Sequence, residues 1–162
     1  VERSEYSDLY YRDFFDHTRE ILGEDRIVTA RPVDNDGYGT SGEDVTYAPR
    51  DINWVGWVGD QDAFFFGIQD ALDNMYWSAE AGYVAFGPDI GGYREDGSKL
   101  GRSREVFLRS AGIGAFSPVM VNGGLGEHRP WAFDDEVAQA YADFAEIHVA
   151  LLPWLRERGW CG

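Results

Sequence analysis

The sequence has almost no cysteine and few basic residues. Cys161 is the only cysteine among 162 residues, which excludes an internal disulfide framework and argues against a zinc site built from Cys and His. Lys and Arg number 14 against 29 Asp and Glu, so the formal net charge is −15. Because nucleic acids and anionic membranes are bound through Lys and Arg, this charge argues against both as partners.

Long hydrophobic runs are also missing. No stretch stays apolar over the roughly 20 residues that a membrane-spanning helix needs, and the first residues do not have the pattern of a signal peptide. The chain begins at Val1 without a methionine, and it ends just past a predicted helix. We therefore expect a piece of a longer protein, and the sequence does not indicate a compartment.

The residues that are present are those of one globular domain. Hydrophobic residues make up 44% of the chain and aromatic residues 15%, which is enough for a core. Apolar residues at helical spacing predict helices over residues 7–22, 63–81, 103–115 and 134–158. Strand-forming runs predict strands over residues 26–31, 54–58, 83–86 and 116–121. Because strands and helices alternate, we expect an α/β fold with a parallel sheet over residues 1–162, equivalent to half of a (β/α)8 TIM barrel.

Each predicted strand ends in a polar or charged residue: Arg31, Asp60, Asp89 and Asn122. Four consecutive strands that point such groups at one rim are hard to explain by helix capping, and the active sites of these barrels lie at that rim. For Asp60 alone, N-capping of the next helix is the common explanation. For Arg31 alone, a surface strand end is the simpler interpretation.

The segment 34–51 is predicted to be a polar loop. Its run Asp34-Asn35-Asp36-Gly37 is similar to the start of a calcium loop, but the full spacing with a late glutamate is not met. Asp-Gly turns explain the same residues. A loop of this length inside a compact domain is usually functional or mobile.

Three aromatic residues, Phe64 to Phe66, open the second predicted helix. We interpret them as core between the helix and the barrel rather than as a stack that binds a ligand. His17 and His148 lie on predicted helices, and we interpret both as structural.

Four segments, taken together and in order, carry a family resemblance. They are Trp57-Val58-Gly59-Asp60-Gln61, Gly87-Pro88-Asp89-Ile90-Gly91-Gly92-Tyr93, Arg104-Glu105-Val106-Phe107-Leu108-Arg109 and Arg129-Pro130-Trp131. These segments resemble glycoside hydrolase family 31, which includes α-glucosidases, α-xylosidases and sulfoquinovosidases. The resemblance covers essentially the whole chain and implies the second half of the barrel, from the helix after the fourth strand to the helix after the eighth.

The resemblance implies that Asp60 is the catalytic acid/base. The family retains the anomeric configuration and uses two aspartates, a nucleophile on the fourth strand and an acid/base in a Trp-x-Gly-Asp motif on the sixth. A carboxyl beside Trp57 at a mostly apolar rim has its charged form disfavoured, so we expect Asp60 to hold a proton near neutral pH and to give it to the leaving oxygen.

The implied nucleophile lies upstream of Val1, because residues 1–6 are not predicted to form a strand. Retention needs a second carboxylate about 5 Å from the first. We therefore expect the 162-residue chain alone to lack the double displacement and the longer protein to have it.

The resemblance also implies the residues that bind substrate. Arg31 is implied to contact sugar hydroxyls and the region of the acid/base, and Asp89 to support the pocket. Trp57 and Tyr93 are implied to be walls of the first sugar subsite, where aromatic rings pack against the sugar.

The end of the eighth strand departs from the family pattern. Many members place there a histidine that binds sugar hydroxyls. In this sequence the nearest match is Asn122, and the only nearby histidine is His128. The departure leaves the sugar that this site accepts open.

Three functions stay open at this point. The first is an α-glycoside hydrolase acting on a small-molecule or oligosaccharide substrate, such as an α-glucoside or α-xyloside. The second is a non-catalytic carbohydrate-binding fragment, which the missing nucleophile favours. The third is a lyase or transglycosylase of the same family.

No metal or organic cofactor is expected, since two carboxylates suffice for this chemistry. A half barrel leaves sheet edges and an apolar face uncovered. Without the other half, we expect the chain to be unstable, to dimerise or to aggregate.

Overall fold

The computed structural model describes residues 3–31 and 48–158. The calcium-like run, most of the predicted loop and Cys161 lie outside the described residues. The helical elements are α1 (Arg3–Leu22), α2 (Phe65–Glu80), α3 (Arg104–Phe116), the 3-10 helix η1 (Pro130–Ala132) and α4 (Asp135–Glu157). None of the described helices is long and apolar enough to cross a membrane.

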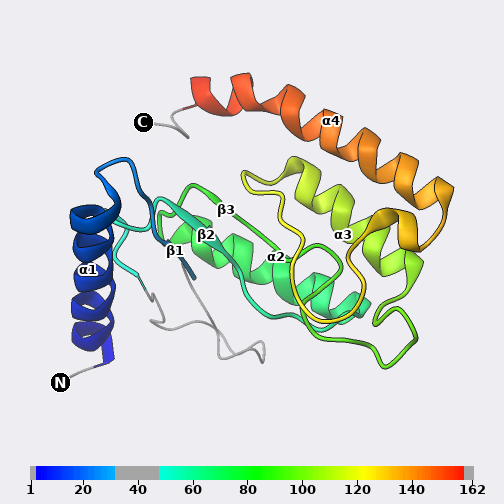
Figure 1. Cartoon of the computed structure of the whole chain (residues 1–162), viewed down its shortest axis with the longest axis horizontal. Coiled ribbons are helices and arrows are strands. Elements are labelled where there is room, and N and C mark those ends of the chain that lie inside the picture. The colour runs from blue at the N-terminus through cyan, green and yellow to red at the C-terminus, as the bar shows by residue number, and fades with distance from the viewer. Residues whose placement is uncertain (1–2, 32–47, 159–162) are drawn as a thin grey trace.

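Three short strands form a parallel sheet at the centre of the molecule (Figure 1). They are β1 (Thr29–Ala30), β2 (Val55–Trp57) and β3 (Phe86–Gly87), and their order in the sheet is β1-β2-β3. Ala30 pairs with Gly56, and Gly56 pairs with Phe86 on its other side. The predicted parallel sheet is therefore present, with shorter strands than expected.

The fourth predicted strand, over residues 116–121, does not form. Helix α3 continues through Phe116, and the Ser117 N–H donates to the carbonyl of Gly114 at 3.1 Å. Pro118, which follows, has no N–H to give to a ladder. The segment still lies beside β3, because Asp89 and Val121 form a single parallel bridge and the Ile90 N–H donates to the Val121 carbonyl.

Most of the predicted helix ends are confirmed. Ser103 caps α3 by accepting from the Val106 N–H, and Asp134 caps α4 by accepting from the Val137 N–H. Gly23 has a φ of 112° at the end of α1, a conformation that glycine adopts without steric cost.

Helix α2 departs from the prediction at its start and on its buried face. Its N-cap is Phe64 with no side-chain cap, so Asp60 is not the capping residue. The buried residues of α2 are small or polar: Gly67, Ala71, Asn74 and Ser78. A Cβ at Gly67 would lie 1.9 Å from the backbone oxygen of Asp62, so the close approach of the two backbones requires glycine.

The interpretation of Phe64–Phe66 as core is wrong in this chain. Their exposed fractions are 41%, 53% and 61%. Phe64 and Phe66 stack on each other with ring centroids 5.2 Å apart, and Arg109 lies over the ring of Phe65. The small residues of α2 face the sheet, so these phenylalanines lie on the outside.

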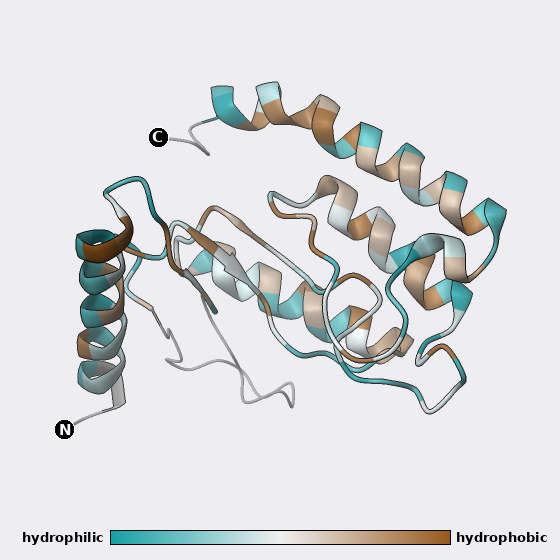
Figure 2. Cartoon of the chain, in the orientation of Figure 1, coloured by the Kyte–Doolittle hydropathy of each residue, from teal (hydrophilic) through white to brown (hydrophobic). Residues whose placement is uncertain are grey.

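The core consists of two clusters. One lies between the sheet and α2 and contains Val58, Ala71, Tyr83 and Phe86. The other joins the segment after β3 to α3 and α4 and contains Ile90, Phe107, Ala111 and Val137, each fully buried. In Figure 2 the outer helices α1 and α4 alternate in hydropathy, as expected for helices with one face toward water.

Candidate active site

Arg31 and Asp60 come together at the carboxyl ends of neighbouring strands. Because β1 and β2 run parallel and pair directly, the residues that follow them emerge at the same edge of the sheet. The Arg31 Nη2 atom lies 2.6 Å from the Asp60 Oδ2 atom. Gly59 makes this possible, since a Cβ at that position would lie 2.9 Å from the Arg31 Cζ atom. Sequence reasoning therefore placed both residues at one site.

The surroundings of Asp60 differ from the expected apolar rim. Its carboxyl group faces the guanidinium of Arg31, and 38% of its side chain is exposed. The guanidinium also lies 5.8 Å from the centroid of the Trp57 ring. Arg31 therefore contacts both the carboxylate and the indole. Periodicity along the chain gave no sign of this ion pair, because its partners are far apart in sequence.

Asp89 is the carboxyl group that the fold buries. Only 7% of the residue is exposed, and its Oδ2 atom has no hydrogen-bond partner among the described residues. Burial raises the pKa of Asp89 to about 7, and the negative charge of Asp60 adds to the rise, while Arg31 and Arg102 oppose it. The family resemblance implied a supporting role for Asp89, and the sequence did not indicate the burial of its carboxyl group.

Arg102 is a part of the site that the sequence did not reveal, since residues 94–102 are polar and predict a surface loop. The residue is only 1% exposed. Its Nη1 atom donates to the Gly92 carbonyl at 2.6 Å, and its Nη2 atom donates to the Leu125 carbonyl. It thereby links the loop after β3 to the loop that precedes η1. The glycines near Arg102 were the sequence signal that could have indicated its burial. Gly126, for example, has a φ of 76°, and a Cβ there would lie 3.1 Å from Arg102 Nη2.

Asn122 and His128 lie in the second of these loops and contact each other. The side-chain amide of Asn122 donates to the His128 carbonyl at 3.0 Å, and its oxygen accepts from the Tyr141 hydroxyl at 2.6 Å. The His128 Nδ1 atom is 3.3 Å from Arg102 Nη1, which assigns Nδ1 as the acceptor and Nε2 as the protonated nitrogen. Burial, followed by the charge of Arg102, lowers the pKa of His128. Asn122 thus supports the loop, while the Nε2 atom of His128 has no partner in the described chain.

Tyr93 lies where three loops meet. Its N–H donates to the Gln61 carbonyl at 2.8 Å, and its own carbonyl accepts from the Leu125 N–H at 2.8 Å. Its side chain is 37% exposed. The backbone of Tyr93 therefore ties the loop after β2 to both glycine-rich loops, and its ring is available to a ligand.

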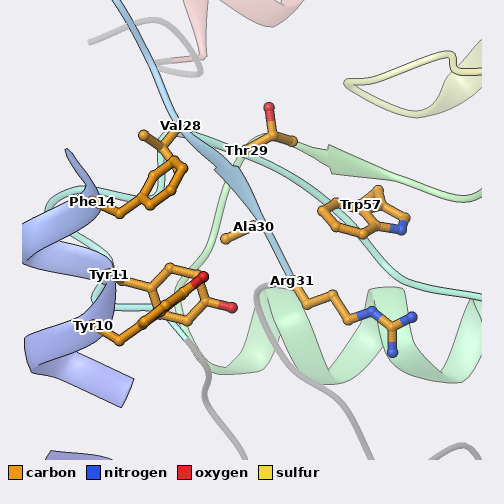
Figure 3. Close-up of a pocket in the computed structure, with 8 residues that line it drawn as sticks. All are labelled: Tyr10, Tyr11, Phe14, Val28, Thr29, Ala30, Arg31 and Trp57. Carbon is orange, nitrogen blue, oxygen red and sulfur yellow. The ribbon is translucent and has the colours of Figure 1, made fainter. Parts of the chain in front are cut away.

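A hollow of about 440 Å³ borders the site on the side of β1 (Figure 3). Tyr10, Tyr11 and Phe14 of α1 face the strand across it, and Arg31 and Trp57 lie at its far end (Figure 3). The described residues contain no group of three or more His, Cys, Asp or Glu side chains that could hold a metal ion. The hollow and the Arg31–Asp60 pair together form the candidate site.

Comparison with known proteins agrees with the motifs. Residues 46–157 match the family model described as the glycosyl hydrolases family 31 TIM-barrel domain. The chain belongs to glycoside hydrolase family 31. The predicted family is thus confirmed, and with it the class of barrel to which these residues contribute.

The relatives are much longer than this chain. Alpha-glucosidase 2 of Bacillus thermoamyloliquefaciens is 26% identical over 102 residues, which are 61% of this chain and 12% of that protein. The cycloalternan-forming enzyme of Listeria monocytogenes, solved with a pentasaccharide substrate, is 20% identical with a TM-score of 0.70, over 94% of this chain and 14% of that one. A mutant of Kfla1895 in complex with isomaltose is 26% identical with a TM-score of 0.57, over 64% of this chain and 16% of that one.

Proposed function

We propose that this chain is the second half of the catalytic barrel of an α-glycoside hydrolase, with Asp60 as the acid/base. The observation that carries the proposal is the position of Asp60. The chain belongs to family 31, and Asp60 follows the carboxyl end of the parallel strand β2. Its carboxylate contacts Arg31, the cation that follows the neighbouring strand β1. Such an edge is where barrel enzymes hold their reacting groups. An α-glucoside is the first substrate to test, since a relative is an α-glucosidase and a neighbouring structure holds isomaltose.

In the proposed reaction Asp60 gives a proton to the leaving oxygen and later takes one from the attacking water. Arg31 holds the carboxyl in place through the contact at 2.6 Å and also contacts sugar hydroxyls. Trp57 and Tyr93 supply aromatic surface to the sugar ring. His128 supports the sugar subsite from behind, since its Nε2 atom is buried, and Asn122 acts on the sugar through His128, whose carbonyl it binds.

The second carboxylate of a retaining mechanism is proposed to come from residues before Val1. Asp89 is the acid near Asp60 in the described chain, but it is buried and carries a pKa of about 7, which does not suit a nucleophile. Among the described strands β1 pairs only with β2, so its other edge can accept a further strand. The hollow between α1 and β1 lies on that edge (Figure 3).

The test compares this 162-residue chain with the same chain extended upstream by the first half of the barrel. We expect turnover of nitrophenyl α-glucoside or α-xyloside by the extended chain alone. Activity of the short chain would place the nucleophile within these residues, and Asp89 would then be replaced first.

The role of Asp60 is tested in the extended chain by the Asp60→Ala variant. We expect activity to be lost and partly restored by azide with an activated substrate. Asp62→Ala is the matched control, since Asp62 is two residues away and forms an exposed ion pair with Arg94 at 3.2 Å. Unchanged activity in the Asp60 variant would overturn its role.

Two alternatives have distinct outcomes. A carbohydrate-binding function without catalysis is favoured by the missing second carboxylate, and it predicts sugar binding by calorimetry with no turnover by either chain. A transglycosylase or lyase of the same family predicts products other than the free sugar. The similarity to a cycloalternan-forming enzyme is the reason to analyse products as well as rates.

A further inference from the structure

The carboxyl group of Asp89 is the one buried acid in the described part of the chain that no ion pair explains. The residue is 7% exposed, and its Oδ2 atom has no hydrogen-bond partner within residues 3–31 and 48–158. A carboxylate that is ionised, buried and short of donors is strongly disfavoured. The geometry therefore favours a proton on this group.

The charged groups around Asp89 do not offset the cost of ionising it. Asp60 repels a second negative charge, while Arg31 and Arg102 attract one. Arg31 lies 2.6 Å from the Asp60 carboxylate, and the two terminal nitrogens of Arg102 donate to the Gly92 and Leu125 carbonyls. Both guanidinium groups thus have other partners at short range.

The Asp89 Oδ1 atom faces a glycine. A Cβ built at Gly123 would be 3.7 Å from this oxygen, which is ordinary van der Waals contact. Position 123 therefore places no side chain over the Oδ1 atom of a buried acid, at the rim that also carries Asp60.

We propose that Asp89 is a neutral carboxylic acid that donates its O–H hydrogen bond to an acceptor oxygen of a bound sugar. This inference rests on the proposed function, because the sugar is the ligand that the site is proposed to take. A neutral donor adds no negative charge of its own beside the Asp60 carboxyl group. The pKa of about 7 agrees with this state in neutral or mildly acidic solution.

The proposal predicts pH-dependent affinity. Above about pH 7 the O–H donor of Asp89 is lost, and a negative charge appears on its carboxyl group. The affinity for a neutral sugar then falls by up to tenfold for each further pH unit. His128 is not the source of this change, because its pKa is lowered by burial and by Arg102, which keeps it neutral over this range.

The protonation state is tested first, by a titration of the wild-type chain, extended upstream by the first half of the barrel and labelled with 13C. The Asp89 carboxyl carbon is assigned through its own Cβ and followed from pH 4 to pH 9. A midpoint near 7 is expected, and a midpoint below 5 would overturn the proposal. This measurement requires neither sugar binding nor turnover, so its failure is distinct from failure of the proposed function.

The donor role is tested by isomaltose binding between pH 5 and pH 9, measured by calorimetry. Wild-type affinity should fall above pH 7, Asp89→Asn should bind equally at all pH values because its amide always donates, and Asp89→Ala should bind weakly throughout. Asp62→Asn is the control and should follow the wild type. Wild-type affinity that does not change with pH, or a pH dependence that persists in Asp89→Asn, would overturn the donor role.

Discussion

The two ends of the chain are packed very differently. Around α3 and α4, Ile90, Phe107, Ala111 and Val137 are all completely buried. On α1 the large apolar side chains lie in water: Tyr6, Leu9, Tyr10, Phe14, Ile21 and Leu22 are each at least half exposed. Phe15 is the buried aromatic residue of α1, and its ring meets Trp54 edge-on at 5.2 Å.

This difference indicates where the chain covers its own apolar surface. The first half of helix α4 finds its partners within the chain, because it packs on α3 and η1, whereas Val149 and Trp154 in its second half are more than half exposed. Helix α1 shows an exposed row of aromatic rings, with Tyr6, Tyr10 and Phe14 stacked in sequence about one turn apart. Such a surface is costly in water and marks a face that another part of a protein covers. The proposed site lies between these two regions, so its α1 side is the less stable one.

The largest effect is expected from Phe107→Ala. Phe107 is completely buried and stacks on Phe133 at 4.8 Å and on Tyr141 at 5.8 Å. Its removal should lower the free energy of unfolding by about 3–5 kcal/mol. Phe14→Ala on α1 is the matched control and should change it by less than about 1 kcal/mol, because Phe14 is 55% exposed. Urea unfolding measures both, and equal losses would contradict the contrast between the two regions.

A smaller loss is expected from Arg102→Met. The substitution keeps an unbranched apolar stem, two atoms shorter than Arg, and leaves the Gly92 and Leu125 carbonyls without their donor. Roughly 2–3 kcal/mol of unfolding free energy should be lost. The pKa of His128 should rise, since Arg102 is one of the two causes that lower it. The ring signals of His128 in a pH titration report this, and an unchanged midpoint would show that burial alone sets the value.

Asp89→Asn should stabilise the chain, and the gain should grow with pH. The pKa of Asp89 is raised from 3.8 to about 7 in the folded state, so its contribution is present below pH 4 and is lost as pH rises through 7. Between pH 5 and pH 7 the wild type should lose about 2 kcal/mol relative to the variant. Urea unfolding at several pH values measures the gap, and a constant gap would contradict a buried neutral acid.

Local features of the helices were predictable from sequence, and the packing of the site was not. Ser103 and Asp134 act as caps because their side chains reach a backbone N–H three residues ahead, a relation that sequence spacing contains. The strand predicted over residues 116–121 does not form, because α3 extends through Phe116 and Pro118 lacks the N–H that a strand donates to its neighbour. The interpretation of Phe64–Phe66 as core failed because the buried positions of α2 are small or polar, and Gly67 among them lies against the backbone of Asp62.

Within the site, strand ends gave the positions of Arg31, Asp60 and Asp89, since parallel pairing brings these ends to one edge. The contacts between loops could not be inferred. Arg102 reads as a surface residue in a polar segment, and only the folded loops bury it. Asn122 follows Val121, which bridges to Asp89, and its side-chain amide is occupied by His128 and Tyr141. Pairing across loops depends on backbone paths that periodicity does not encode.

The smallest effect is expected where α1 meets residue 51. Arg12 Nη1 donates to Asp51 Oδ2 at 2.8 Å, and Arg12 Nε donates to Asp8 within α1 at 2.9 Å. These side chains lie in water, where the attraction is weak and is offset by the entropy of holding them. Arg12→Ala should therefore leave the urea midpoint unchanged, with faster hydrogen exchange confined to α1. The Arg12 bond lowers the pKa of Asp51, so the pair persists above the ordinary pKa of an aspartate and is lost in stronger acid. A clear fall in the urea midpoint would show that this contact holds α1 in place, and that α1 is a more integral part of the fold than its exposed rings indicate.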